Sequence, residues 1–308
     1  MFGQIGPLAQ SLESYQFSQF SDLNLLNGVT NGLVTLPNGL TVAPELDYGD
    51  TFDFEARYAP QAQVDSFFPN GAYQVRLETV HDGIRTFNLN LTGDAYPNAP
   101  QIVNFPATQS VNPSNAFVLS WGAFAGGAVS DFIAVELKSQ GDFSSEGAFD
   151  TPGIGESGAL NGTHTSVTIP AFTFAPGRRY AGELIFARMG QTDTTTYPGA
   201  IGASLYFSGT LFELQAIGTP IRPSLQISNL GNSVVRIMVT GERNRFYTVE
   251  STDSLLGNPV FWQPRFNGVA NSNITGFTGS CEFQDGVLSL SGSRFYRVRE
   301  GADFGGGP

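Results

Sequence analysis

Thr51-Phe-Asp-Phe-Glu-Ala-Arg-Tyr58 alternates apolar and polar side chains without a break. In an extended chain, successive side chains point to opposite faces, so the aromatic residues and Ala56 share one face and the charged residues share the other. The stretch therefore predicts a β-strand that is buried on one side and exposed to solvent on the other.

The same period continues on both sides of this strand. Tyr73–Val80 and Ile84–Leu91 also alternate, and they flank an Asp82-Gly83 turn, which is typical of a β-hairpin. Upstream, Pro37-Asn38-Gly39 separates two short apolar runs and predicts a second hairpin. Short runs punctuated by turn residues recur along the chain, so the sequence predicts an all-β protein.

Length and composition indicate how many cores the chain can build. Of its 308 residues, 41 % are hydrophobic and 12 % aromatic, so large cores can be buried. The 37 glycines and 18 prolines fit a chain with many turns. A β-sandwich takes roughly 100 residues, so we expect two or three β-sandwiches in tandem.

Two proline-rich segments mark the expected boundaries. Ala95-Tyr-Pro-Asn-Ala-Pro100 and Gly218-Thr-Pro-Ile-Arg-Pro223 each contain prolines that stop a strand ladder. Near the N-terminus, Tyr15–Phe20 has strand-like spacing, and we expect an extended arm there that leads into a strand. The predicted organisation is an arm (residues 1–20), three sandwiches (21–97, 98–219 and 220–300) and a Gly-rich tail (301–308).

Two strand-like stretches in the middle piece share the pattern of a known family. Ala116-Phe-Val-Leu-Ser-Trp121 ends in a tryptophan, and Asp131–Leu137 follows it. They resemble the early strand of fibronectin type III domains, which ends in a core tryptophan, and the strand after it, and the resemblance implies an immunoglobulin-like sandwich. Phe174-Ala-Pro-Gly-Arg-Arg-Tyr180 resembles the corner of the family, and Phe68-Pro-Asn-Gly-Ala-Tyr73 repeats it in the first piece. The resemblance implies that the Tyr180 hydroxyl bonds to nearby backbone.

Three stretches of the third piece carry a second resemblance: Arg245–Leu255, Trp262 and Ser293-Arg-Phe-Tyr-Arg-Val-Arg299. The resemblance is to the small β domain that ends many large secreted proteins of environmental bacteria. It implies an extracellular or cell-surface setting and says little about chemistry. The first 20 residues lack a basic start and a continuous apolar stretch, so we expect any export signal to have been removed or to lie outside this sequence.

Charge and cysteine content restrict the partners. The net charge is −12, only 14 % of residues are charged, and Lys138 is the one lysine. Close pairs of cations such as Arg178-Arg179 and Arg243/Arg245 are few, so a phosphate-binding face for nucleic acid is not expected. Cys281 is the single cysteine, which excludes an intrachain disulfide. No apolar stretch approaches 18 residues, so membrane insertion is not expected.

Catalytic constellations are not evident in the sequence, and we expect the chain not to be an enzyme. Its two histidines, His81 and His164, fall in different predicted domains and have no cysteine or second histidine at ligand spacing. A zinc site or a Ser–His–Asp triad is hard to build from them. No cofactor is expected, and calcium is the one alternative that the residues leave open.

Two weaker site hypotheses remain. Asp47 and Asp50 belong to the densest acidic set, and with neighbouring carbonyls they would suit calcium. The alternatives for this set are a solvated strand face or a glycosidase pair. Phe261 and Trp262 lie between turn segments and are candidates for ligand binding, whereas the resemblance favours a core role for them.

Three functions follow from these observations. The first is a non-catalytic structural or adhesion subunit that self-associates, with its N-terminal arm adding a strand to the sheet of a neighbour. The second is a carbohydrate-binding accessory module of a secreted polysaccharide-degrading protein. The third is a β-sandwich enzyme that acts on glycans, which requires two carboxylates in a cleft.

Overall fold

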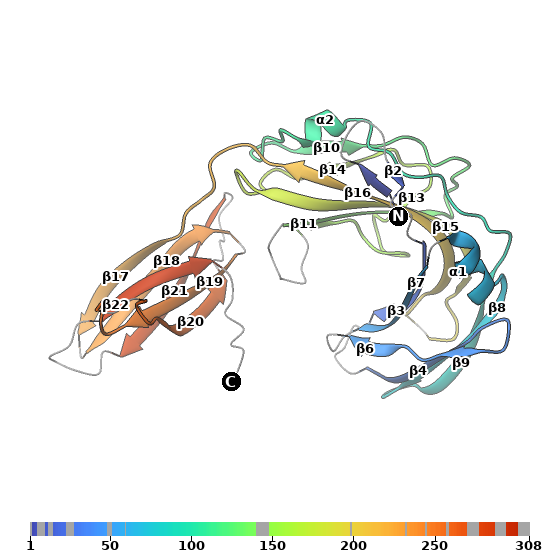
Figure 1. Ribbon diagram of the computed structural model, residues 1–308, viewed down its shortest axis with the longest axis horizontal. Helices are drawn as coiled ribbons and strands as arrows, with labels where there is room; N and C mark the ends of the chain where they lie inside the picture. The colour runs from blue at the N-terminus through green and yellow to red at the C-terminus, as the bar shows by residue number, and fades with distance from the viewer. Residues whose placement is uncertain are drawn as a thin grey trace.

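The computed structural model contains 56 % strand and 5 % helix, which confirms the all-β prediction. It describes residues 2–4, 10–11, 15–22, 28–47, 51–58, 60–139, 148–197, 199–231, 233–243, 245–256, 259–269, 277–286 and 294–300. These residues form three packed β units that follow one another along the chain (Figure 1).

The N-terminal unit packs two sheets against each other. One sheet has the order β5-β4-β8-β9 and the other β3-β7-β6, with the short helix α1 (Gln61–Phe67) beside β7 and β3. Its strands are β3 (Tyr15–Asp22), β4 (Val29–Thr35), β5 (Thr41–Val42), β6 (Glu45–Asp47), β7 (Thr51–Tyr58), β8 (Gly71–Thr79) and β9 (Gly83–Leu91). Both predicted hairpins are present, and Phe54, Ala56 and Tyr58 of β7 pack against the core as their alternation predicts.

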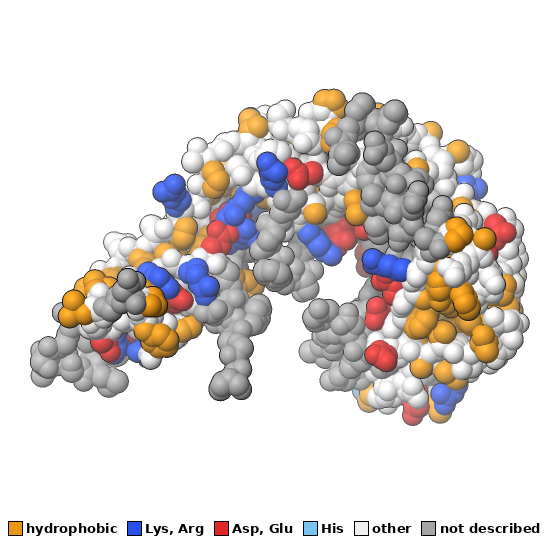
Figure 2. All heavy atoms as spheres, in the orientation of Figure 1, with side chains coloured by type: hydrophobic (Ala, Val, Ile, Leu, Met, Phe, Trp, Pro, Cys, Tyr) orange, Lys and Arg blue, Asp and Glu red, His pale blue; other side chains and the backbone are white. Residues whose placement is uncertain are grey.

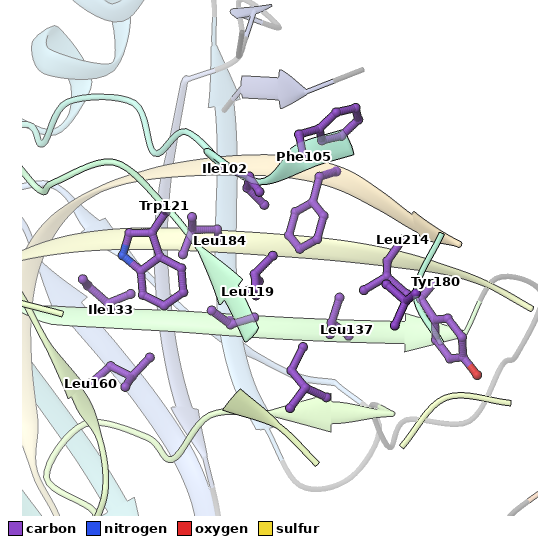
Figure 3. Packing of buried hydrophobic residues seen from close by; sticks show 14 of the residues in the cluster. Ile102, Phe105, Leu119, Trp121, Ile133, Leu137, Leu160, Tyr180, Leu184 and Leu214 are labelled. Carbon is purple, nitrogen blue, oxygen red and sulfur yellow. The ribbon is translucent and has the colours of Figure 1, made fainter. Parts of the chain in front are cut away.

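The middle unit is built around a long sheet with the order β12-β11-β15-β16-β1-β2, faced by the pair β10-β14. Its elements are β1 (Phe2–Gln4), β2 (Gln10–Ser11), α2 (Phe105–Thr108), β10 (Phe117–Ser120), β11 (Phe132–Ser139), β12 (Phe149–Asp150), β13 (Leu160–Asn161), β14 (Ser166–Ile169), β15 (Arg179–Asp193) and β16 (Gly202–Gln215). Trp121, Leu184 and Leu214 belong to the core between the sheets (Figure 3). Trp121 is 2 % exposed, so its predicted core position is confirmed.

The C-terminal unit packs two three-stranded sheets, β17-β18-β21 and β20-β19-β22. Its strands are β17 (Ser224–Gly231), β18 (Val234–Glu242), β19 (Phe246–Thr252), β20 (Gln263–Val269), β21 (Thr278–Gly286) and β22 (Phe295–Glu300). Ile237, Val239, Tyr247 and Val249 form the buried centre, and Cys281 packs against it. The identity of the three units as immunoglobulin or fibronectin domains stays a prediction.

The predicted extended arm is not confirmed as a free segment. Phe2–Gln4 pairs in parallel with Thr210–Phe212 of β16, in the sheet of the middle unit. Gln4 is 1 % exposed; its Nε2 donates to the Ile102 carbonyl at 2.9 Å and its Oε1 accepts from the Ile102 N–H at 2.9 Å. Because a sheet edge leaves backbone groups unpaired, β1 satisfies part of the edge of β16 within the same chain.

The hairpin of β15 and β16 also connects the first two units. It reaches past the middle core and lies against β9 (Figure 1). There the Tyr197 hydroxyl donates to the Leu77 carbonyl at 3.0 Å, and the Ser204 hydroxyl donates to the Asn90 carbonyl at 2.8 Å. Arg85 donates to the Thr196 carbonyl and stacks over the Tyr197 ring. The loop of this hairpin and its β16 arm therefore hold the N-terminal unit in place.

Among the described residues, the structure contains no helix with the length and apolar character needed to span a membrane.

Candidate functional site

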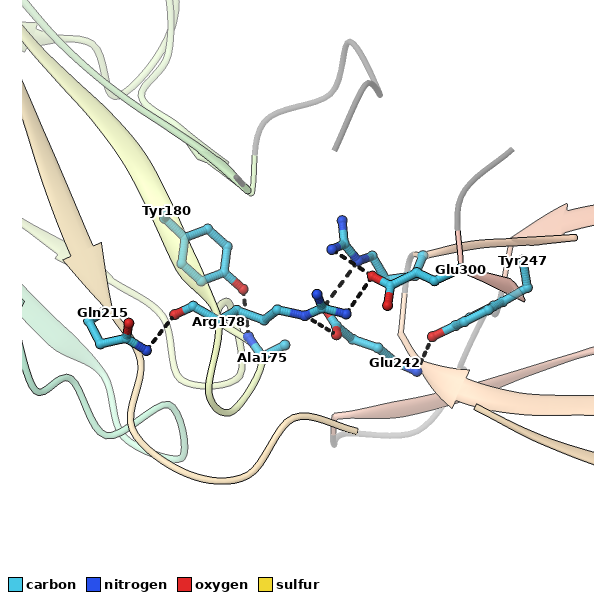
Figure 4. A network of polar contacts seen from close by, with 8 residues as sticks. Ala175, Arg178, Tyr180, Gln215, Glu242, Tyr247 and Glu300 are labelled. Atoms are coloured by element: carbon cyan, nitrogen blue, oxygen red, sulfur yellow. Dashed lines mark hydrogen bonds and ion pairs between the residues drawn. The ribbon is translucent and has the colours of Figure 1, made fainter. Parts of the chain in front are cut away.

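A cluster of polar contacts lies where the middle and C-terminal units meet (Figure 4). Arg178 comes directly before β15, Glu242 ends β18, Arg245 directly precedes β19, and Glu300 ends β22. Strand ends from both units thus bring two arginines and two glutamates together. We call these four residues the joint network.

Each carboxylate of the joint network is shared by two guanidiniums. Arg178 Nε donates to Glu242 Oε2 at 2.8 Å, and Arg178 Nη2 donates to Glu300. Arg245 Nη2 lies 2.8 Å from Glu300 Oε1, and Arg245 Nε lies 3.4 Å from Glu242 Oε1. The formal charges cancel, and the planar guanidinium favours this two-pronged geometry.

Burial makes the joint network sensitive to the loss of any member. Glu242 is 4 % and Arg245 7 % exposed. Burial raises the pKa of Glu242, while the hydrogen bond from Arg178 opposes that rise. For Arg178, burial lowers the pKa, but hydrogen bonds to Glu300 and Glu242 outweigh it, so the pKa is raised overall. Because an unpaired buried charge is costly, the network favours one geometry of the joint.

An aromatic contact lies beside the joint network. The Phe172 and Phe277 ring centroids are 5.1 Å apart, and Arg243 Nη2 donates to the Phe172 carbonyl at 3.2 Å. Phe172 has a φ of 66°, a left-handed conformation that is strained for a bulky residue. Its N–H donates to the Pro113 carbonyl at 2.8 Å, so contacts on several sides hold this conformation.

Two tyrosines shape the turns that carry the joint network. The Tyr180 hydroxyl accepts the Ala175 N–H at 2.7 Å, and the Tyr247 hydroxyl accepts the Glu242 N–H at 2.6 Å. The first of these confirms the backbone hydrogen bond predicted for the corner at Tyr180. Gly177 has a φ of 73° and lies so close to Pro220 that an added Cβ would be 2.5 Å from its ring, so this turn needs glycine.

The sequence does not predict the joint network as a site. It does single out Arg178-Arg179 and Arg243/Arg245 as close cation pairs, and the structure brings residues of both pairs to this joint. The carboxylates that receive them, Glu242 and Glu300, carry no comparable sequence signal.

The two aromatic candidates, Phe261 and Trp262, have different surroundings. Phe261 is 77 % exposed and lines a surface pocket of about 290 Å³ together with Leu256, Asp253 and Arg265. Trp262 is half-buried, and the Arg297 guanidinium lies 4.5 Å from its ring centroid. The Phe261 ring is therefore open to a ligand, whereas one face of Trp262 is occupied.

The calcium hypothesis keeps its status as a prediction. Asp47 ends β6, and Asp50 lies outside the described residues. Within the described part of the chain, no three His, Cys, Asp or Glu residues are grouped so that they could hold a metal ion.

The two histidines lie in separate units. His81 is exposed in the turn between β8 and β9. His164 Nδ1 accepts the Asn161 N–H at 3.0 Å, and its carbonyl accepts the Trp121 indole N–H at 3.0 Å. In this setting His164 supports the core tryptophan and its local turn.

Comparison with known proteins adds little to this description. No protein family and no curated protein matches the sequence. Among solved structures that match is that of a 1.5-MDa bacterial ice-binding adhesin, studied for its host cell surface retention. The match covers 92 % of this chain and 88 % of that chain at 9 % identity, with a TM-score of 0.20. A score of this size does not establish a shared fold.

Proposed function

We propose that the chain is a non-catalytic structural or adhesion subunit that works outside the cell by holding β units in a fixed arrangement. The observation that carries the proposal is the bracing of both joints. The hairpin of β15 and β16 bonds to the N-terminal unit, and the joint network bonds the middle unit to the C-terminal one. Flexible linkers alone would leave the units free to reorient.

Self-association through the N-terminal strand is the second part of the proposal. In the folded chain β1 holds its place through three residue pairs with β16 and through the buried Gln4. The β1 strand of a neighbouring copy would make the same contacts beside β16, because exchanging an identical element between copies needs no new interface. Repeated exchange would join subunits head to tail into a polymer.

Electron microscopy of negatively stained protein tests this proposal. The full chain should form filaments or high oligomers, and deletion of residues 1–11, which removes β1 and β2, should weaken them. Deletion of the Gly-rich residues 301–308 is the matched control and should leave the assemblies unchanged. A full chain that is strictly monomeric would contradict the polymer.

A disulfide trap separates exchange between copies from pairing within one chain. Gly3 and Leu211 are paired residues of β1 and β16. The double variant Gly3→Cys/Leu211→Cys, in a Cys281→Ala background, should yield a ladder of covalent oligomers on a non-reducing gel if β1 is exchanged. Cross-linked monomers alone would restrict β1 to its own chain and remove the exchange mechanism.

Carbohydrate binding is the alternative function, and the exposed Phe261 favours it. Aromatic side chains recognise sugars by stacking on the apolar face of the ring, and Phe261 offers its ring beside a pocket that also holds Asp253 and Gln263. Binding to a broad glycan panel, abolished by Phe261→Ala and retained by Phe295→Ala, would support this module. Failure to bind any glycan on the panel would count against it.

A further inference from the structure

β17 is an edge strand whose one protective feature is a register shift near its end, between Asn229 and Gly231. It pairs with β18 and with no other described strand. Its eight residues, Ser224-Leu-Gln-Ile-Ser-Asn-Leu-Gly231, include no charged residue and no proline, and all but Leu225 are exposed. An exposed edge of this kind presents a row of free backbone donors and acceptors to another strand.

The other edge strands of the same unit carry charged residues or proline. β21, at the far side of the β17 sheet, carries Glu282 and Asp285. In the second sheet, β20 carries Pro264 and Arg265, and β22 carries arginines and a glutamate. Charges and prolines are the devices that keep edge strands from pairing. Their absence from β17 alone among these four edges marks it as the edge that can accept a strand.

Apolar side chains gather at the same edge. Ile227 pairs with Ile237, which is fully buried, yet Ile227 itself is 48 % exposed. Leu230 on β17 and Phe295 on the adjoining β22 are also exposed. Figure 2 shows hydrophobic side chains over the part of the unit where these strands lie. A strand added at β17 would cover Ile227 as well as satisfy the backbone.

From these observations we infer that β17 pairs in antiparallel fashion with β17 of a second copy of this chain. The partner strand must be uncharged, extended and exposed over a similar length, and β17 is the longest edge strand in the described part of the chain that lacks both charge and proline. Antiparallel pairing with itself gives a two-fold interface that closes at a dimer. It joins the two β17 sheets into one and brings both Ile227 side chains to the same interface.

This interface goes beyond the proposed function and does not use the N-terminal strand. Light scattering and sedimentation of the full chain over a concentration series should show a dimer that survives deletion of residues 1–11. Loss of the dimer on that deletion would assign it to β1 and overturn the inference. A chain that stays monomeric throughout would overturn it too, and would leave the edge to a strand of another protein.

Charge placed on β17 tests the edge directly. Gln226 is exposed and pairs with Met238, so Gln226→Lys adds a cation on the outer strand without a facing charge. Two such lysines brought together across the two-fold should weaken the dimer by about two- to fivefold, because like charges on paired strands repel. Ser280→Lys is the matched control. It lies opposite Thr240 on β21, the charged strand at the other edge of the same sheet, and should leave the dimer intact.

Mixing opposite charges separates an interface effect from misfolding. Gln226→Glu alone should weaken the dimer as Gln226→Lys does, and an equimolar mixture of the two variants should restore dimers. A misfolded variant cannot be rescued by mixing. Failure of the mixture to dimerise, or loss of dimer in Ser280→Lys with none in Gln226→Lys, would overturn pairing through β17.

Discussion

At the scale of single residues, the hydroxyl of Tyr180 contributes a hydrogen bond that the fold depends on. It accepts the Ala175 N–H at 2.7 Å, and burial raises its pKa to about 12, so it stays protonated at neutral pH. Tyr180→Phe leaves that buried N–H without its acceptor, which should lower the free energy of unfolding by about 1–3 kcal/mol. Urea denaturation followed by fluorescence measures the change.

Tyr58→Phe is the control for Tyr180→Phe. The Tyr58 ring stacks on Phe67 at 5.1 Å, and the described residues supply no hydrogen-bond partner for its hydroxyl. Its removal should change the free energy of unfolding by less than about 0.5 kcal/mol. Equal losses in the two variants would show that the Ala175 hydrogen bond is not what stabilises the corner.

Residues that act over short sequence distances could be predicted, and those that act over long distances could not. The core position of Trp121 and the corner hydrogen bond of Tyr180 follow from local patterns that any β corner imposes. Arg178 and Glu242 are 64 residues apart, and nothing near either one specifies the other. Their meeting depends on how two units dock, which is decided by tertiary packing and not by local periodicity.

At the scale of elements, alternation predicted the strands that have one buried and one exposed face, such as β7, β8 and β9. It missed the short helix α1 and the strand β1, whose pairing partner is distant in the sequence. α1 buries only Val64, so it carries no apolar stripe that would reveal a helix. β1 spans three residues, and its partner, Thr210–Phe212, lies more than two hundred residues away. Sequence spacing cannot reveal such a pairing.

A row of carboxylates across β12, β11 and β15 gives a prediction at the same scale. Glu136 pairs with both Asp150 and Glu183, and the Glu183 carboxylate lies over Gly209. Burial and then the charge of Glu136 raise the pKa of Glu183, with Lys138 opposing. A raised carboxyl pKa means that ionisation favours the unfolded state. Glu183→Gln should therefore stabilise the protein at pH 7.5, by about 0.2–1 kcal/mol.

The pH dependence of Glu183→Gln distinguishes this cause from better packing. The gain should shrink as pH falls and vanish below about pH 4, where the carboxyl is protonated in both states.

Asp193→Asn should have an effect of the opposite sign. It should destabilise the protein at neutral pH, and this loss should disappear on acidification. Backbone hydrogen bonds, first of all from Thr196, lower the pKa of Asp193, so its contribution is present at neutral pH and is lost on acidification. A gain for Glu183→Gln that is constant with pH would contradict the prediction.

At the scale of the whole molecule, both joints use the same physical means. A surface strand or turn of the middle unit reaches across each boundary and bonds to backbone or charge on the other side, as Tyr197 does with the Leu77 carbonyl and Arg178 does with Glu242. Such contacts are directional, so they fix an angle between units in a way that apolar contact alone does not. A fixed angle repeated in every copy is what a regular assembly requires.

The second joint offers the sharpest test of this rigidity, because adjacent arginines differ in what they touch. Arg178 reaches across to Glu242 and Glu300, whereas Arg179 is largely exposed and pairs with Glu213 inside its own unit.

Arg178→Ala should release the C-terminal unit, which small-angle X-ray scattering would record as a broader distance distribution. Because Arg245 keeps both glutamates partly neutralised, each unit should still fold, and thermal unfolding of the C-terminal unit should separate from that of the middle unit. Arg179→Ala should leave both the scattering profile and the thermal unfolding curve of the unmodified chain unchanged. An unaltered profile in Arg178→Ala would mean that the other contacts at the joint, those of Phe172 with Phe277 and Arg243, fix it without Arg178.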